Sequence, residues 1–334
     1  MSLPYWIIDV FSTTPYKGNP LAIVDNTTAN LSSTQMKLMA RQFNLSETTF
    51  FSKPTGCKAT YRLRSFLPDG REVFGAGHNI LGAWWFLASS GRLELTGPPR
   101  SASEDGTEEH VVFQELGAAV TPVTILKTGS GISVTLRQAP PKAHRSHPDP
   151  ASLAASIGLS ADEIGVAVNG ARSQVQLQPQ VMSTSTTHHL LVPVSSAAAL
   201  NKVRVEKDRL LEQLALVDER AYGIFLFTPA GSTDGRPSYE ARFFSPGMSG
   251  EDPATGSAAG PFLAYLWNSG ALAMAGGSGE IEVHQGLRVG RHCVIRVRIE
   301  TGRGELGVDV DIIGGGAEVA DGSMRIPSQE LEFQ

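Results

Sequence analysis

The chain has 334 residues, a net charge of −5 and 41% apolar residues, which is typical of a globular protein long enough for two domains. Lysine and arginine form no block, and no apolar stretch reaches the roughly 18 residues of a membrane helix. Composition therefore favours neither nucleic-acid nor membrane binding. The amino-terminal segment does not resemble a signal peptide, and Cys57 and Cys293 show no metal-ligand spacing, so we expect a cytoplasmic protein.

The first part of the sequence predicts short strands and two helices. Ser32-Ser33-Thr34-Gln35 is a capping box that starts one helix, and Asn44 suits its end. A second helix runs from about residue 78 to 90 and is closed by Gly91. The polar segment 100–110 is expected to be a mobile excursion. Strands are expected at 5–11, 21–24, 48–52, 58–66, 71–74, 111–114, 121–126 and 131–137.

Pro140-Pro141 and the polar residues up to Pro150 predict a boundary between domains 1–140 and 141–334, and the last strand of the second domain can return to the first. Because most strand pairs lack an intervening helix, we expect mainly antiparallel pairing in both domains. The order of elements recurs after the boundary. The expected elements are helices at 151–157 and 207–215, strands at 189–194, 222–228 and 239–244, then a glycine-rich turn, an apolar helix and further strands.

Two glycine-rich loops indicate an internal duplication. The segment that begins Gly77-HNILGAWWFL aligns with the one that begins Gly256-SAAGPFLAYL at a spacing of 179 residues, and both close as Ser-Gly-x-Leu. Chance similarity at a common helix-stop signal is the alternative. Both helices are apolar nearly all round, which predicts burial on every side. We therefore expect an α+β fold of two similar domains, each a mostly antiparallel curled sheet or barrel around a central helix.

The amino-terminal ends of these two helices are candidate anion sites. Their backbone N–H groups lack helical partners, the helix dipole is positive there, and glycine allows a ligand to approach. If the repeats face each other, a carboxylate would bind in the cleft between them. The alternative for the first loop is dinucleotide binding, with Gly75, Gly77 and Gly82 as the three glycines of the fingerprint and Glu94 near its acidic position. The third glycine of that set comes two places too late, and the apolar helix and the duplicate loop also fit it badly.

Several polar residues at turns are candidates for chemistry, and each has a structural alternative. Glu47 lies between a helix stop and a strand, where a solvated charge is common. His78 lies at a helix amino terminus, which would lower its pKa, although packed or capping histidines occur there too. Asp252, Thr255 and Ser257 could simply cap the following helix. No pair of His, Asp or Glu residues shows the spacing of a metal site.

Five segments together carry a family resemblance. They are GNPLAIV (18–24), NLSETTFF (44–51), AGHNILG (76–82), HHLLVPV (188–194) and EDPATGSAAGP (251–261), with QGLRVGR (285–291) as a weaker sixth. In this order, over essentially the whole chain, they resemble the PhzF family, the phenazine-biosynthesis-protein-like isomerases of the diaminopimelate-epimerase-like fold. The resemblance implies two domains of one topology, a site in the cleft between them and a homodimer.

The resemblance also implies roles for individual residues. Glu47 would be the acid/base that moves a proton, and His78, Asp252 and Ser257 would complete the catalytic group. The implied substrate-binding residues are Asn19, Gly77, Asn79, Thr255 and Gly256, with the backbone N–H groups of the two glycines holding the substrate.

The epimerases of this fold use two cysteines, at positions that correspond here to about Ala76 and Pro253. A two-thiol racemase is therefore not supported, whereas one carboxylate suits a proton shift within a substrate. The resemblance thus implies an isomerase of a small carboxylate-bearing metabolite that needs no cofactor and no metal. The alternatives are an epimerase, an acid-catalysed cyclase and a non-catalytic metabolite-binding protein. Asn79-Ile80 departs from the family's usual Pro-Thr, so the substrate of the family does not transfer.

Overall fold

The structure is a computed structural model that describes residues 1–75, 77–95, 98–103, 106–170, 173–185, 187–248, 250–302 and 305–333. The chain divides into two compact units, one made of Met1–Leu136 with Ile313–Gln334 and the other of Arg137–Ile312. The polypeptide therefore passes between the units twice. No helix among the described residues is long and apolar enough to cross a membrane.

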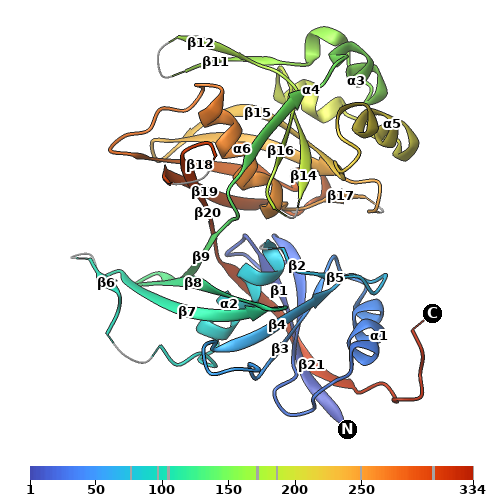
Figure 1. The fold of residues 1–334 in the computed structure, drawn as a ribbon, viewed down its shortest axis with the longest axis vertical. Coiled ribbons are helices and arrows are strands. Elements are labelled where there is room, and N and C mark those ends of the chain that lie inside the picture. The colour runs from blue at the N-terminus through green and yellow to red at the C-terminus, as the bar shows by residue number, and fades with distance from the viewer. Residues whose placement is uncertain are drawn as a thin grey trace. The chain divides into compact units, whose positions relative to one another are not determined.

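The first unit is a mixed sheet with two helices (Figure 1). Its strands pair in the order β21-β1-β2-β3-β4-β7-β8-β9, while β5 adds to β4 and β6 adds to β7. The bounds are β1 Ser2–Val10, β2 Asn19–Asp25, α1 Ser33–Phe43, β3 Thr48–Ser52, β4 Tyr61–Phe66, β5 Glu72–Val73, α2 His78–Ser89, β6 Ser101–Ala102, β7 Glu108–Leu116, β8 Ala119–Thr128, β9 Gly131–Arg137 and β21 Gly316–Arg325.

The second unit has the same kind of sheet and four helices. Its strands pair in the order β10-β13-β14-β15-β16-β18-β19-β20, β17 adds to β16, and β11 and β12 form a separate hairpin. The bounds are β10 Lys142–Ser146, α3 Pro150–Ser156, β11 Val166–Asn169, β12 Gln174–Leu177, β13 Gln180–Ser183, β14 His188–Pro193, α4 Ala197–Lys202, α5 Lys207–Val217, β15 Gly223–Thr233, β16 Arg236–Phe244, β17 Glu251–Asp252, α6 Gly256–Asn268, β18 Ser278–Gln285, β19 Cys293–Thr301 and β20 Val308–Gly314.

The two units share one topology, because their parallel strand pairs fall at the same places. The pairs β2–β3 and β4–β7 are parallel in the first unit, and β14–β15 and β16–β18 are parallel in the second. Each of these pairs has a helix between its strands, which supplies the crossover that a parallel pair needs. Hairpin-connected neighbours such as β7–β8 and β18–β19 are antiparallel. The predicted α+β fold of two similar domains is confirmed.

The central helices α2 and α6 are buried on nearly all sides, as their composition predicts. Strands β1, β2, β3, β8 and β21 contact α2, and β10, β13 and β19 contact α6. Trp84 of α2 is fully buried, and its indole Nε1 donates a hydrogen bond to Gln114 Oε1 at 2.8 Å. Trp84 therefore contributes its large apolar ring to the core while the one polar atom of its side chain stays hydrogen-bonded.

The close approach of α2 to its sheet depends on Gly82. A Cβ atom there would lie 2.5 Å from Val10 Cγ2 and 2.9 Å from Leu21 Cδ2, both fully buried. We expect Gly82→Ala to lower the free energy of unfolding by about 1–2 kcal/mol, because overpacking outweighs the better helix propensity of alanine. Urea unfolding measures the change. Gly56→Ala, where a Cβ would meet nothing within 4 Å, is the control. A stabilised Gly82→Ala variant would contradict the packing argument.

An arginine–glutamate pair occurs at the same place in each unit. Arg64 of β4 donates to both carboxylate oxygens of Glu72 in β5, at 2.6 and 2.7 Å. Arg242 of β16 donates to Glu251 in β17 at 2.8 and 3.0 Å. Glu72 lies opposite Phe66 and Glu251 lies opposite Phe244, so the two pairs have the same register. Each pair holds the short strand that precedes the amino terminus of a central helix.

Two polar stretches for which the sequence predicts no strand contain strands. Residues 142–146 form β10 and pair with β13, although the sequence KAHRS has no apolar alternation. Ser101 and Ala102, within the expected excursion 100–110, pair with β7, while residues 104–105 lie outside the described part of the chain. The strand at 142–146 was not predicted from the sequence, because backbone pairing with a neighbouring strand outweighs a polar composition there.

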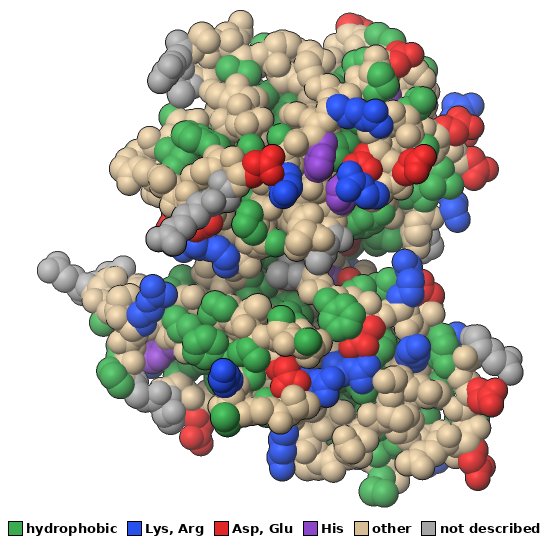
Figure 2. Space-filling view, viewed as in Figure 1, with side chains coloured by type: hydrophobic (Ala, Val, Ile, Leu, Met, Phe, Trp, Pro, Cys, Tyr) green, Lys and Arg blue, Asp and Glu red, His purple; other side chains and the backbone are tan. Residues whose placement is uncertain are grey.

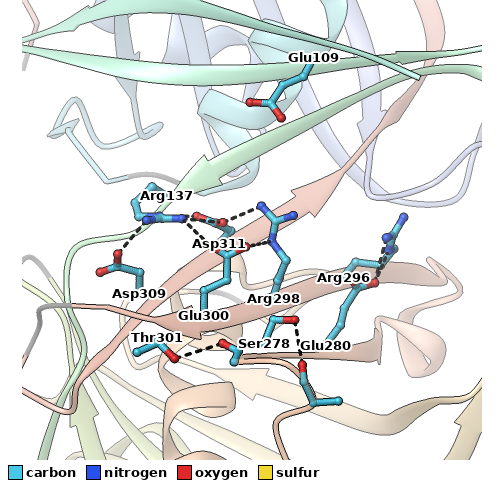
Figure 3. A network of polar contacts seen from close by, with 12 residues as sticks. Glu109, Arg137, Ser278, Glu280, Arg296, Arg298, Glu300, Thr301, Asp309 and Asp311 are labelled. Atoms are coloured by element: carbon cyan, nitrogen blue, oxygen red, sulfur yellow. Dashed lines mark hydrogen bonds and ion pairs between the residues drawn. The ribbon is translucent and has the colours of Figure 1, made fainter. Parts of the chain in front are cut away.

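Ion pairs bind Arg137, the residue at which the chain enters the second unit, to the strands β19 and β20 of that unit. Figure 3 shows Arg137 and Arg298 on either side of Asp311, which accepts hydrogen bonds of 2.6 and 2.9 Å from their Nε and Nη2 atoms, respectively. Burial alone would raise the pKa of Asp311, but these hydrogen bonds outweigh it and hold the pKa below its usual range. Elsewhere, acidic and basic side chains are interspersed on the face seen in Figure 2.

Candidate active site

Glu47 and His78 meet in the first unit. The left-handed conformation of Asn44 ends α1, so the chain turns and Glu47 directly precedes β3. His78 is the first residue of α2, and its Nε2 lies 3.4 Å from Glu47 Oε2. The turn after α1 and the start of α2 thus bring together two side chains that are 31 residues apart in the sequence.

The carboxyl group of Glu47 is largely withdrawn from water. Its Oε2 is buried and has no hydrogen-bond partner among the described residues, although the side chain as a whole is 20% exposed. Burial raises the pKa of Glu47 to about 7. Near neutral pH the group is therefore present in both protonation states, which suits a residue that donates and accepts the same proton.

Thr48, Gly77 and Asn79, which are next to this pair in the sequence, and Asn19 of β2 are the other predicted or polar residues of this region. Thr48 Oγ1 and Asn79 Nδ2 are buried and form no hydrogen bond with the described residues. Gly77 is the N-cap of α2 and, having no side chain, leaves the first N–H groups of the helix uncapped by its own atoms. Asn19, at the start of β2, is fully buried opposite Val10. Buried polar atoms without partners are rare in folded proteins, and here they adjoin Glu47 and His78.

In the second unit, Asp252 and Thr255 form a buried hydrogen-bonded cluster at the start of α6. Thr255 Oγ1 donates to Asp252 Oδ2 at 2.6 Å, and Thr255 N donates to Gln285 Oε1 at 3.1 Å. Gln285 Nε2 donates to the carbonyl of Asp252 at 2.7 Å and lies 2.9 Å from Thr255 Oγ1. The cluster fixes the turn before α6. Gln285 lies in the QGLRVGR segment, but the sequence alone assigned it no role.

Ser257 and Gly256 lie beside residues that the sequence did not single out. Ser257 Oγ is 3.3 Å from Tyr222 Oη, which is 3.4 Å from His189 Nε2. Burial, with the neighbouring His188, lowers the pKa of His189 to about 3, so its imidazole is neutral. The carbonyl of Gly256 accepts a hydrogen bond from Gln138 Nε2 at 2.9 Å. Only the three-dimensional pairing of distant strands reveals these contacts.

The structure thus places the predicted residues in two groups, one in each unit. Their roles in catalysis and binding stay predictions. Within the described part of the chain, no three His, Cys, Asp or Glu side chains are placed to hold a metal ion. Of the two positions that correspond to epimerase cysteines, Ala76 lies outside the described residues, and Pro253 follows β17. Cys57 is exposed and Cys293 is buried, and neither forms a disulfide with a described residue.

The raised pKa of Glu47 predicts how stability depends on pH. Because the native state keeps this proton while the unfolded state loses it, the free energy of unfolding should fall by up to about 3 kcal/mol from pH 4.5 to above pH 7. We expect Glu47→Gln to remove this decline, so that the variant gains stability relative to wild type at pH 8 but not at pH 4.5. Thermal unfolding across this pH range tests it. The exposed Glu318→Gln is the control, and equal pH profiles for all three proteins would contradict the prediction.

Comparisons with known proteins extend over nearly the whole chain. A family model described as phenazine biosynthesis-like protein matches residues 8–322. A trans-2,3-dihydro-3-hydroxyanthranilate isomerase of Pseudomonas aeruginosa is 29% identical over 95% of this chain and 98% of its own length. An uncharacterized isomerase of Mesorhizobium japonicum is 29% identical over 96% of this chain and 98% of its own.

The fold comparison agrees with the sequence comparisons. The crystal structure of a PhzF-family phenazine biosynthesis protein of Bacillus anthracis covers 98% of this chain and all of its own, with a TM-score of 0.80 at 22% identity. That likeness shows a common two-domain fold. The full-length relatives named as isomerases show that the protein is an enzyme of the isomerase type. With its matching repeats, its Glu47–His78 pair and a family model that spans residues 8–322, the chain belongs to the phenazine biosynthesis-like protein family.

Proposed function

We propose that the protein is an isomerase that shifts a proton within a small carboxylate-bearing metabolite, with Glu47 as the proton shuttle and without a cofactor. One observation carries the proposal. Glu47 Oε2 is buried 3.4 Å from His78 Nε2, and the pKa of Glu47 is raised to about 7. A single acid of this pKa can protonate one carbon and recover a proton from another, so the reaction regenerates the catalyst.

The surrounding groups fit supporting roles. His78 would orient the carboxyl group of Glu47 and stabilise the charge that develops when its proton leaves. The amide of Asn79, whose Nδ2 has no partner among the described residues, and the N–H groups near Gly77 supply hydrogen-bond donors for a carboxylate, and we assign Asn19 to substrate binding as well. In the second unit we assign Asp252 and Ser257 to the catalytic group, and Thr255 and Gly256 to substrate binding. We also propose a homodimer, which analytical ultracentrifugation tests.

Deuterium labelling distinguishes this function from its rivals. Trans-2,3-dihydro-3-hydroxyanthranilate, the compound in the name of the Pseudomonas aeruginosa relative, is the first substrate to try, followed by other small unsaturated carboxylates. In deuterated water, an isomerase yields a product with a shifted double bond and deuterium at one carbon. Exchange at a stereocentre with inversion would indicate an epimerase, and a new ring would indicate a cyclase. Binding without any product across the substrate set would indicate a non-catalytic binding protein.

A further inference from the structure

The first unit has a cavity at the opposite end of β3 from Glu47. Its volume is about 490 Å³, within the range of small-molecule sites. It lies where the parallel strands β2 and β3 both end, at Asp25 and Ser52, and where α1 begins at Ser33. Glu47 precedes the first residue of β3, so the five-residue strand separates the two places by roughly 16 Å. The cavity is therefore distinct from the candidate active site.

The lining of this cavity is cationic. Lys53, Arg62 and Arg64 line it, and no aspartate or glutamate is among its lining residues. Hydroxyl groups of Ser32 and Ser33 add hydrogen-bond donors, whereas the hydroxyl of Thr55 donates to Glu115. The lining itself therefore offers positive charge and donors, while Glu72 and Glu115 bind Arg64 and Arg62 from outside it.

The three cations are not equally committed to protein partners. Arg64 uses Nε and Nη2 to bind Glu72. Arg62 Nε lies 3.3 Å from Glu115 Oε1, outside the cavity lining, and its remaining N–H groups have no partner among the described residues. Lys53 is exposed and forms no ion pair with the described residues. One unpaired ammonium and several unused guanidinium donors therefore remain for a ligand.

We propose that this cavity binds the phosphate group of a small phosphorylated metabolite, with Lys53 and Arg62 as its main contacts. A phosphomonoester carries nearly two negative charges and several acceptor oxygens, which match an unpaired lysine, a second cation and the hydroxyl groups of Ser32 and Ser33. A monocarboxylate would use fewer of these donors and neutralise less of the charge. The site is separate from the chemistry assigned to Glu47 and does not depend on the proposed reaction.

Calorimetric titration at fixed ionic strength tests the proposal with two probes of similar size, glycerol 3-phosphate and glycerate. We expect saturable binding of glycerol 3-phosphate to wild type, and binding of glycerate at least about tenfold weaker. Lys53→Glu should weaken the binding of glycerol 3-phosphate by at least about tenfold. Lys58→Glu, an exposed lysine in the same loop but outside the lining, should change it by no more than about twofold.

Four results would overturn the proposal. Absence of saturable binding, or equal affinity for glycerate, would show that the cavity is not a phosphate site. Equal losses of affinity in both lysine variants would show that binding depends only on the net charge of the protein. Glu47→Gln separates the cavity from the active site. Unchanged phosphate affinity in that variant supports the cavity, whereas loss of affinity would place the probe beside Glu47 instead.

Discussion

Glu47→Gln is expected to lower turnover by about 10²–10⁴-fold while the protein remains folded. Glutamine keeps the size of the side chain and needs no charge in the buried position, but it cannot release or accept the proton. Steady-state kinetics with the substrate found by the deuterium experiment measure the loss, and circular dichroism checks the fold. Glu318→Gln, which changes an exposed carboxylate of β21, should retain wild-type turnover.

A second variant tests whether His78 acts through Glu47. If the pair 3.4 Å apart works as one unit, His78→Gln combined with Glu47→Gln should be no slower than Glu47→Gln alone. Multiplicative losses in the double variant would show that His78 contributes separately. Turnover of Glu47→Gln within about twofold of wild type would refute the proton-shuttle role altogether.

Arg242→Met is expected to lower the free energy of unfolding by about 3–5 kcal/mol. The change leaves the carboxylate of Glu251, whose side chain is 5% exposed, buried without its cation. It also removes the hydrogen bonds that Arg242 donates to the carbonyls of Leu200 and Val203. Urea unfolding followed by fluorescence measures the loss.

The duplicated pair in the first unit provides a matched comparison. Arg64 and Glu72 are 19% and 21% exposed, so Arg64→Met should be less damaging, because water solvates the remaining carboxylate. Arg242→Met combined with Glu251→Leu should recover part of the stability, since it removes the buried charge. If Arg64→Met proves as harmful as Arg242→Met, burial is not what sets the size of the effect.

Much of the fold follows from local sequence signals. The capping box at Ser32 and the left-handed Asn44 set both ends of α1 as expected. The strand predicted at 48–52 coincides with β3, whose residues are β-branched and aromatic up to Ser52. The two nearly all-apolar segments predicted two buried central helices, which are α2 and α6. In these cases the residues that specify an element are within a few positions of one another.

The parts that were missed depend on distant partners. Strand β10 is polar and forms through pairing with β13, and Ser146 lies opposite Gln180 there. Gln285 reaches Asp252 across 33 residues, and Gln138 reaches Gly256 across 118. Glutamine is common on protein surfaces, so its type alone signals no buried role. These contacts form only when distant strands come together in the folded protein, so no local sequence pattern predicts them.

The pairing of β1 with β21 has a consequence for how the chain folds as it is made. Ser2 lies opposite Arg325, so one edge of β1 has no neighbour until the residues of β21, Gly316–Arg325, have been synthesised. The second unit, Arg137–Ile312, is continuous and can complete its sheet earlier. The first unit, whose synthesis begins before that of the second, is therefore the last to complete its sheet. Nascent chains that end before β21 would expose the β1 edge, and an unpaired strand edge of this kind can pair with another chain and promote aggregation.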